Sequence, residues 1–137
     1  MGTRSIVTFK DEWNDKEICA VYRQYDGYPE GRGKELAEFL DGYRIGNGIP
    51  SGLSIHREIK YANGMRELSI LWIVEEKSKN MFGNVYLEPA GFRSPDLEWH
   101  YEVTCSKEGT PQVKVYDIYG KETYDSIEDA LKRPRKG

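Results

Sequence analysis

The chain has 137 residues, of which 38% are hydrophobic, 12% aromatic and 31% charged, and its formal net charge is −3. This length is typical of one domain, and the aromatic content excludes an intrinsically disordered chain. The slightly acidic balance argues against a nucleic-acid binder that depends on a positively charged surface.

The first elements along the chain are predicted to be a β-hairpin and a helix. Residues 5–9 (SIVTF) and 17–25 (EICAVYRQY) are rich in the β-branched and aromatic residues that favour strands. The turn between them is short and charged, so the two strands are expected to pair antiparallel. Residues 34–40 carry the apolar stripe of a helix, and Asp41-Gly42 is a typical helix end.

A second helix is predicted over residues 65–77, after a connection rich in glycine and proline at residues 46–54. Apolar residues recur at helical spacing within it, and Asn63-Gly64 precedes it. Residues 69–74 (SILWIV) also fit a strand, but the length of the apolar pattern favours the helix.

The remaining elements are predicted to be three strands and a short helix. Residues 84–87 form a short strand, and residues 97–105 alternate apolar with polar side chains over their whole length. Residues 112–118 are expected to pair back on them as a hairpin. The helix over residues 126–132 begins at Ser126, a favoured N-cap.

These elements predict one α+β domain over residues 1–132, followed by a basic tail at residues 133–137. Its expected architecture is an antiparallel sheet of about five strands, with two helices packed on one face and a short C-terminal helix. No apolar run approaches the roughly 18 residues of a membrane span, and no secretory signal is recognised. We therefore expect a cytoplasmic protein without a membrane partner.

Neither a metal site nor a cofactor is predicted. Cys19 and Cys105 are expected to be reduced and buried, because they lie in a chain without a secretory signal. Together with His56 and His100 they offer four metal ligands, but no CxxC or HxxxH pair is present. His100 shares a strand face with neighbouring carboxylates, which are expected to raise its pKa, although a solvated sheet face explains the same pattern.

The segment at residues 23–34 departs from regular patterns, with three glycines and a proline between a strand and a helix. Main-chain N–H groups at a helix start, with basic side chains nearby, favour an anion. Neither the Walker A loop nor the dinucleotide fingerprint is matched. The predicted ligand-binding residues are Arg23, Tyr25, Asp26, Gly27, Tyr28, Gly31, Gly33 and Lys34.

A purely structural reading of the same segment is also open. Asp26 and Glu30 would then cap and charge the first helical turn, and Arg23 would close the loop by pairing with one of them.

Several stretches resemble one family. They are Thr3-Arg4-Ser5-Ile6, YRQYDGYPEG at residues 22–31, Asn63-Gly64-Met65, and YLEPAG at residues 86–91. They are similar to small prokaryotic and phage proteins with an N-terminal TRSxI and a YRxYDGYPxGxG motif. The resemblance implies a prokaryotic or phage cytosolic setting and a helix after Asn63-Gly64, and it implies no activity. Family members tend to have Asp-Gly near the C-terminus, where this chain has Asp125-Ser126.

Three functional hypotheses follow, and the absence of a catalytic motif favours the first. It is a non-enzymatic binding protein, such as a phage or mobile-element accessory, that recognises a protein or a small anionic ligand through residues 23–34. The alternative is a small hydrolase or nuclease-like enzyme that uses Asp26, Glu30 and a histidine. The third is a homo-oligomer that associates through exposed tyrosine and tryptophan side chains.

Overall fold

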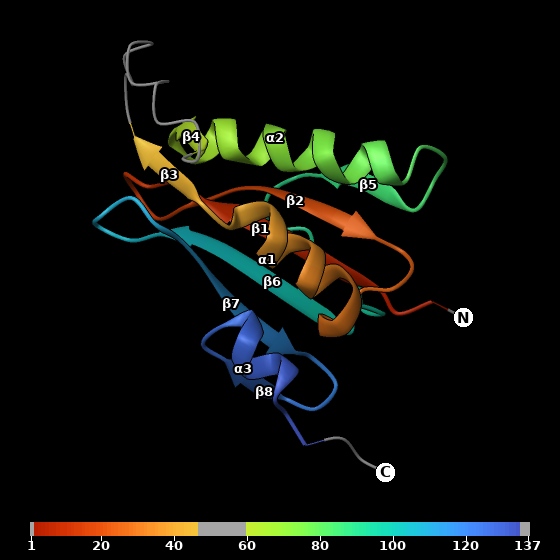
Figure 1. Ribbon diagram of the computed structural model, residues 1–137. Helices are drawn as coiled ribbons and strands as arrows, with labels where there is room; N and C mark the ends of the chain where they lie inside the picture. Colours follow the sequence, from red (N-terminus) through yellow and green to blue (C-terminus); the bar gives the residue numbers. More distant parts are fainter. Residues whose placement is uncertain (1, 47–59, 135–137) are drawn as a thin grey trace.

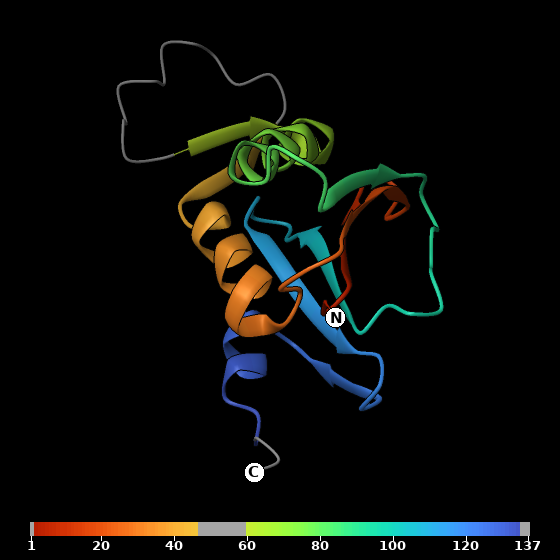
Figure 2. The ribbon, with the colours of Figure 1, turned by 90° about the vertical axis from the view of Figure 1, so that its right-hand side faces the viewer.

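The computed structural model describes residues 2–46 and 60–134, in which a six-stranded mixed sheet carries helices along one side (Figures 1 and 2). The sheet consists of β1 (Ser5–Lys10), β2 (Glu17–Arg23), β5 (Val85–Glu88), β6 (Trp99–Cys105), β7 (Pro111–Asp117) and β8 (Glu122–Tyr124), in the order β5-β2-β1-β6-β7-β8. A separate pair, β3 (Tyr43–Gly46) and β4 (Lys60–Asn63), runs parallel.

The predicted α+β class is confirmed, whereas the all-antiparallel sheet is wrong at its centre. The predicted hairpins β1–β2 and β6–β7 are antiparallel, as are β2–β5 and β7–β8. Strands β1 and β6 are parallel, with Ser5 opposite Trp99 and Phe9 opposite Val103. Short turns constrain only strands that are neighbours in the chain, so the sequence pattern carried no information on this long-range pair.

The helices are α1 (Lys34–Leu40), α2 (Gly64–Lys79) and α3 (Ile127–Leu131), and one π-helical turn, η1 (Pro29–Gly33), leads into α1. Helix α2 confirms the helical interpretation of residues 65–77, because Met65, Leu68 and Trp72 lie on one buried face. Helix α3 begins as predicted, with the Ser126 hydroxyl accepting a hydrogen bond from the Asp129 N–H.

The hydrophobic core lies between these helices and the sheet. From the sheet it receives side chains such as Val7, Phe9, Val21, Tyr101 and Val103, and from the helices Leu36, Met65, Leu68 and Trp72. Ile6 and Thr8 alternate with these core residues and point to the other face, where the chain between β5 and β6 covers part of the sheet (Figure 2). Both faces near β1 are therefore buried.

The two cysteines are free and half-buried, and burial raises the pKa of both thiols. Arg133, placed by the sequence in the basic tail, is instead bonded to the domain through Glu30. Within residues 2–46 and 60–134, no helix combines the length and the apolar character needed to cross a bilayer.

Candidate functional site

The segment at residues 23–34 turns its two arginines into the protein. The fully buried Arg32 forms a bidentate pair with Glu76, through Nε to Oε2 at 2.7 Å and Nη2 to Oε1 at 2.6 Å. Its Nη1 donates to the Ser5 carbonyl and hydroxyl oxygens. Arg23 is 5% exposed, and its Nη1 lies 3.4 Å from Glu76 Oε2. One carboxylate of α2 thus serves two guanidinium groups.

A second carboxylate completes this cluster. Arg23 Nη1 donates to Glu35 Oε1 at 3.0 Å, and its Nε donates to the Tyr25 carbonyl oxygen at 2.7 Å. Two positive and two negative charges therefore neutralise one another where β2, η1, α1 and α2 meet. Removing charges from water is tolerated only with such dense hydrogen bonding. Arg23, one of the predicted ligand-binding residues, is therefore buried and bonded within the protein, and its carboxylate partners are Glu35 and Glu76 rather than Asp26 or Glu30.

The glycines of this segment serve close packing. A Cβ atom on Gly27 would lie 2.4 Å from Ser5 Oγ, and one on Gly31 would lie 2.6 Å from the Asp26 carbonyl oxygen. The positive φ of this turn falls on Asp26, at 59°. The buried Tyr101 hydroxyl donates to the Gly27 carbonyl oxygen at 2.7 Å, and burial raises the pKa of Tyr101.

Only part of the segment is displayed to solvent: Tyr25, Asp26, Tyr28 and Lys34 are exposed. The Tyr28 hydroxyl donates to Asp26 Oδ1 at 3.1 Å, and this carboxylate raises the pKa of Tyr28. These outward side chains form a surface beside the buried arginines and their carboxylates.

Among the described residues, Glu30 and His100, two of those proposed for a hydrolase, do not converge. Both Glu30 oxygens accept from Arg133, at 2.9 and 3.1 Å, and that guanidinium stacks 4.9 Å above the centre of a Trp99 ring. His100 shares the face of Thr8, which is opposite to the face that holds the core, so the sheet separates it from Glu30. His56 lies outside the described residues.

His100 is part of a buried polar cluster on the second face of the sheet. Its Nε2 lies 2.7 Å from Thr8 Oγ1, and its ring stacks on Tyr116 with centroids 5.1 Å apart. Burial lowers the pKa of His100 to about 4, and the charges of Arg93 and Lys10 act in the same direction against Glu17. The predicted upward shift is therefore wrong, because desolvation outweighs the nearby carboxylates.

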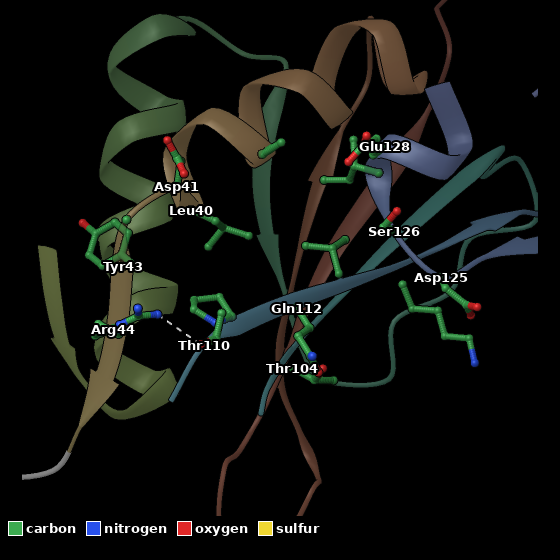
Figure 3. A pocket seen from close by; sticks show the side chains of 16 residues that line it. Leu40, Asp41, Tyr43, Arg44, Thr104, Thr110, Gln112, Asp125, Ser126 and Glu128 are labelled. Carbon is green, nitrogen blue, oxygen red and sulfur yellow. Dashed lines mark hydrogen bonds between the residues drawn. The ribbon is translucent and has the colours of Figure 1, made fainter. Parts of the chain in front are cut away.

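A groove of about 860 Å³ opens between the end of α1, β3, β7 and the start of α3 (Figure 3). Asp41 and Arg44 stand on one side of it, Asp125 and Ser126 on the other, and Gln112 lies between the two sides. None of the residues 23–34 lines it.

The groove exists because β8 covers only part of β7. Strand β8 pairs with the half of β7 that runs from Val115 to Asp117. The chain then leaves the sheet at Asp125, where the N-cap of α3 follows. Residues 111–114 of β7 consequently form a sheet edge, and they line the groove.

The main chain of Val113 faces this edge. Ile118 N–H donates to the Glu98 carbonyl oxygen and Ser106 N–H to the Thr110 carbonyl oxygen, so even-numbered residues of β7 bond to β6. Main-chain groups alternate in direction along a strand. Val113 therefore directs its N–H and C=O toward the groove, and neither group has a hydrogen-bond partner in the part of the chain that the structure describes.

The walls of the groove are apolar and its rim is charged. Apolar lining comes from Ala37, Leu40, Val113 and Ile127. On the rim, Arg44 Nη1 donates to Thr110 Oγ1 at 3.1 Å, and Glu128 pairs with Lys132 at 3.3 Å. Asp41 and Asp125 are exposed and form no ion pair within the described ranges.

In the described part of the chain, the lining of the groove holds neither histidine nor cysteine, and Ser126 Oγ already accepts the capping hydrogen bond of α3. Sequence patterns missed this site because the three-residue strand β8 is too short to show periodicity. One signal in the sequence was usable. The predicted strand at residues 112–118 is long, so a short strand after it would leave part of its outer edge unpaired.

Comparison of the chain with models of protein families, with curated proteins and with solved structures finds no significant match. The resemblance to small prokaryotic and phage proteins stays a prediction.

Proposed function

We propose that the protein is a non-enzymatic binding protein, and that it holds a segment of another protein in the groove between α1, β3, β7 and α3. The observation that supports this most is the open edge at Val113 beside apolar walls. Unpaired main-chain groups at a sheet edge readily bond to an extended chain. A volume of about 860 Å³ is also within the range of ligand sites.

The groove supports a protein partner better than a small anion. The three carboxylates that line the groove, Asp41, Asp125 and Glu128, outnumber its two cations, Arg44 and Lys114, so its net charge does not attract an anion. The buried arginines of residues 23–34 are already bonded to carboxylates. The outward residues Tyr25, Asp26, Tyr28 and Lys34 stay a secondary candidate surface. A cytoplasmic setting and an accessory role in a phage or mobile element belong to the proposal through the sequence resemblance alone.

A pair of tryptophan substitutions on α1 tests the proposed site. Ala37 is exposed and lines the groove, whereas its exposed neighbour Glu38 does not. Peptides are first selected on the folded full chain from a random dodecapeptide library displayed on phage. We expect Ala37→Trp to weaken the best peptide at least about tenfold, since the indole fills the groove, and Glu38→Trp to leave binding unchanged.

Unchanged binding by Ala37→Trp would place the peptide elsewhere and contradict the proposal. So would chemical-shift changes of the main-chain amides that centre on residues 25–34 when the peptide is added. Circular dichroism of both variants shows that each is folded.

A further inference from the structure

Resting on the proposed function, we infer that the occupant of the groove is a basic, extended segment of another protein, which adds a strand beside residues 111–114 of β7. Main-chain hydrogen bonds to Val113 hold this strand. Lysine or arginine side chains on it meet the carboxylates of Asp41 and Asp125.

The position of the added strand follows from β8. Tyr124 is the last residue of β8 and stands opposite Val115, and the chain turns away one residue later. A strand beside residues 111–114 would continue in line with β8 along the same edge of β7. Four residues in extended conformation span roughly 13 Å, so the segment needs only a short run without internal structure.

The side chains of the segment alternate between two surroundings. One set faces the apolar walls formed by Ala37, Leu40 and Ile127, and the other set faces solvent. Aliphatic residues at alternate positions therefore suit the groove, as in other cases of strand addition. The Pro111 carbonyl offers one further acceptor, because it shares the direction of the Val113 main chain.

Carboxylates outnumber cations among the charged side chains that line the groove: Asp41, Asp125 and Glu128 stand against Arg44 and Lys114. Asp41 lies at the C-terminal end of α1, whose last turn has no basic residue. A carboxylate is unfavourable at this end of a helix, where carbonyl oxygens concentrate negative charge; the Lys60 ammonium of β4 already binds the Phe39 carbonyl oxygen there, at 2.8 Å. A lysine or arginine from the partner would interact with the Asp41 carboxylate and with the carbonyl oxygens at the end of α1. Asp125 adds a second carboxylate at the opposite side (Figure 3), and the net charge of −3 attracts basic partners over a longer range.

Two capped synthetic peptides test the charge. One is a hexapeptide that alternates lysine with valine, and the other replaces each lysine with glutamate. We expect the lysine peptide to bind at least about tenfold more tightly, and to lose most of this advantage with the Asp41→Asn/Asp125→Asn double variant or in high salt. Equal affinity of the two peptides overturns the inference.

Two changes test the main-chain pairing. Val113→Pro removes the outward N–H without removing a β6–β7 hydrogen bond, whereas Val113→Ala loses the same packing and keeps the N–H. We expect the lysine peptide to weaken about tenfold with proline and less than about twofold with alanine. If the proline variant does not fold, a series of lysine peptides with single N-methyl groups replaces it, and one or two positions must then abolish binding to the unchanged protein.

The outcomes separate this inference from the proposed function. One outcome would keep the groove as a binding site and contradict the basic strand. In it, Ala37→Trp weakens the selected peptides, but these peptides are acidic, or their affinity does not change with Val113→Pro and with N-methylation. A second outcome would identify the occupant as the basic tail, residues 133–137, of another copy of the chain. In that case light scattering shows that the chain alone dimerises, deletion of the tail abolishes the dimer, and the inference also fails.

Discussion

Glu76 is the residue on which the packing around residues 23–34 depends. Its two oxygens hold Arg32 in a bidentate pair and also approach Arg23, and its side chain is fully buried. A lone carboxylate in such a place would be strongly disfavoured, and so would Arg32 without it. The sequence motif around Arg23 and Arg32 is therefore explained by a helix more than forty positions away from Arg32.

Replacing Glu76 tests this cluster. Glu76→Gln leaves the buried Arg32 guanidinium without a carboxylate and Arg23 with Glu35 alone, and we expect the free energy of unfolding to fall by about 3–5 kcal/mol. Glu75→Gln makes the same change one residue earlier, at a partly exposed pair with Lys79, and should cost less than about 1 kcal/mol. Urea titration followed by circular dichroism measures both, and equal losses would contradict the structural role of Glu76.

His100 predicts how stability depends on pH. The pKa of a histidine in the unfolded chain is close to 6.5, and burial lowers that of His100 to about 4. Between these values the unfolded state binds more protons, so stability is complete above about pH 6.5 and is lost as the pH falls toward 4. The groups that face the ring are Thr8, Tyr116, Arg93, Glu17 and Lys10.

Between about pH 7 and about pH 5, proton uptake by His100 in the unfolded state lowers the free energy of unfolding by about 2 kcal/mol. His100→Gln keeps a polar group near Thr8 and removes the titration. Between pH 7 and pH 5 we therefore expect the free energy of unfolding of this variant to fall by about 2 kcal/mol less than that of the unaltered protein. Urea titrations at the two pH values measure the difference. Parallel losses in the two proteins would show that His100 does not contribute.

At the scale of elements, the passage from β2 into α1 requires a close approach of two backbones. A Cβ on Gly27 would meet Ser5 Oγ at 2.4 Å and the Thr3 carbonyl oxygen at 2.7 Å. We expect Gly27→Ala to destabilise the protein by about 1–3 kcal/mol, because β1 has to move.

Gly33 provides the matched control for this prediction. It has helical φ and ψ, and the nearest atom to an added Cβ is Tyr101 Cε1 at 3.3 Å. Gly33→Ala should change the free energy of unfolding by less than about 1 kcal/mol, since alanine also favours the helix. Melting curves of the two variants show which one loses more stability. A larger loss for Gly33→Ala than for Gly27→Ala would contradict the close approach at Gly27.

Elements with a long and regular pattern were predictable, whereas short ones were predicted only in part: the strand at residues 84–87 and the helix at residues 126–132 correspond to β5 and α3. The alternation at residues 97–105 and the helical spacing at residues 65–77 recur over enough positions to identify β6 and α2. The short strands β3, β4 and β8 show no such repetition. The groove lies between two of these missed strands, β3 and β8, so the sequence could not locate it.

Within residues 23–34 the sequence identified the right segment for the wrong reason. Glycine, proline and arginine signal special geometry in a ligand loop and in a packed turn alike. What separates the two is the partner of each arginine, and that partner is Glu76, a residue of α2 with no local link to the motif. Long-range contacts of this kind leave no mark on local patterns.

At the scale of the whole molecule, one sheet collects strands from both ends of the chain. β1 lies between its hairpin partner β2 and the distant β6, and its side chains are buried on both faces. Such non-local pairing slows folding, because the entropy of a long chain segment is lost before the contact forms.

During synthesis this arrangement sets an order of events. When β1 and β2 leave the ribosome, one side of β1 has no neighbour until Trp99 and the residues after it are made. Most of the polypeptide must therefore be translated while one edge of the central strand still has unpaired main-chain groups. During this period the edge is a binding site for chaperones.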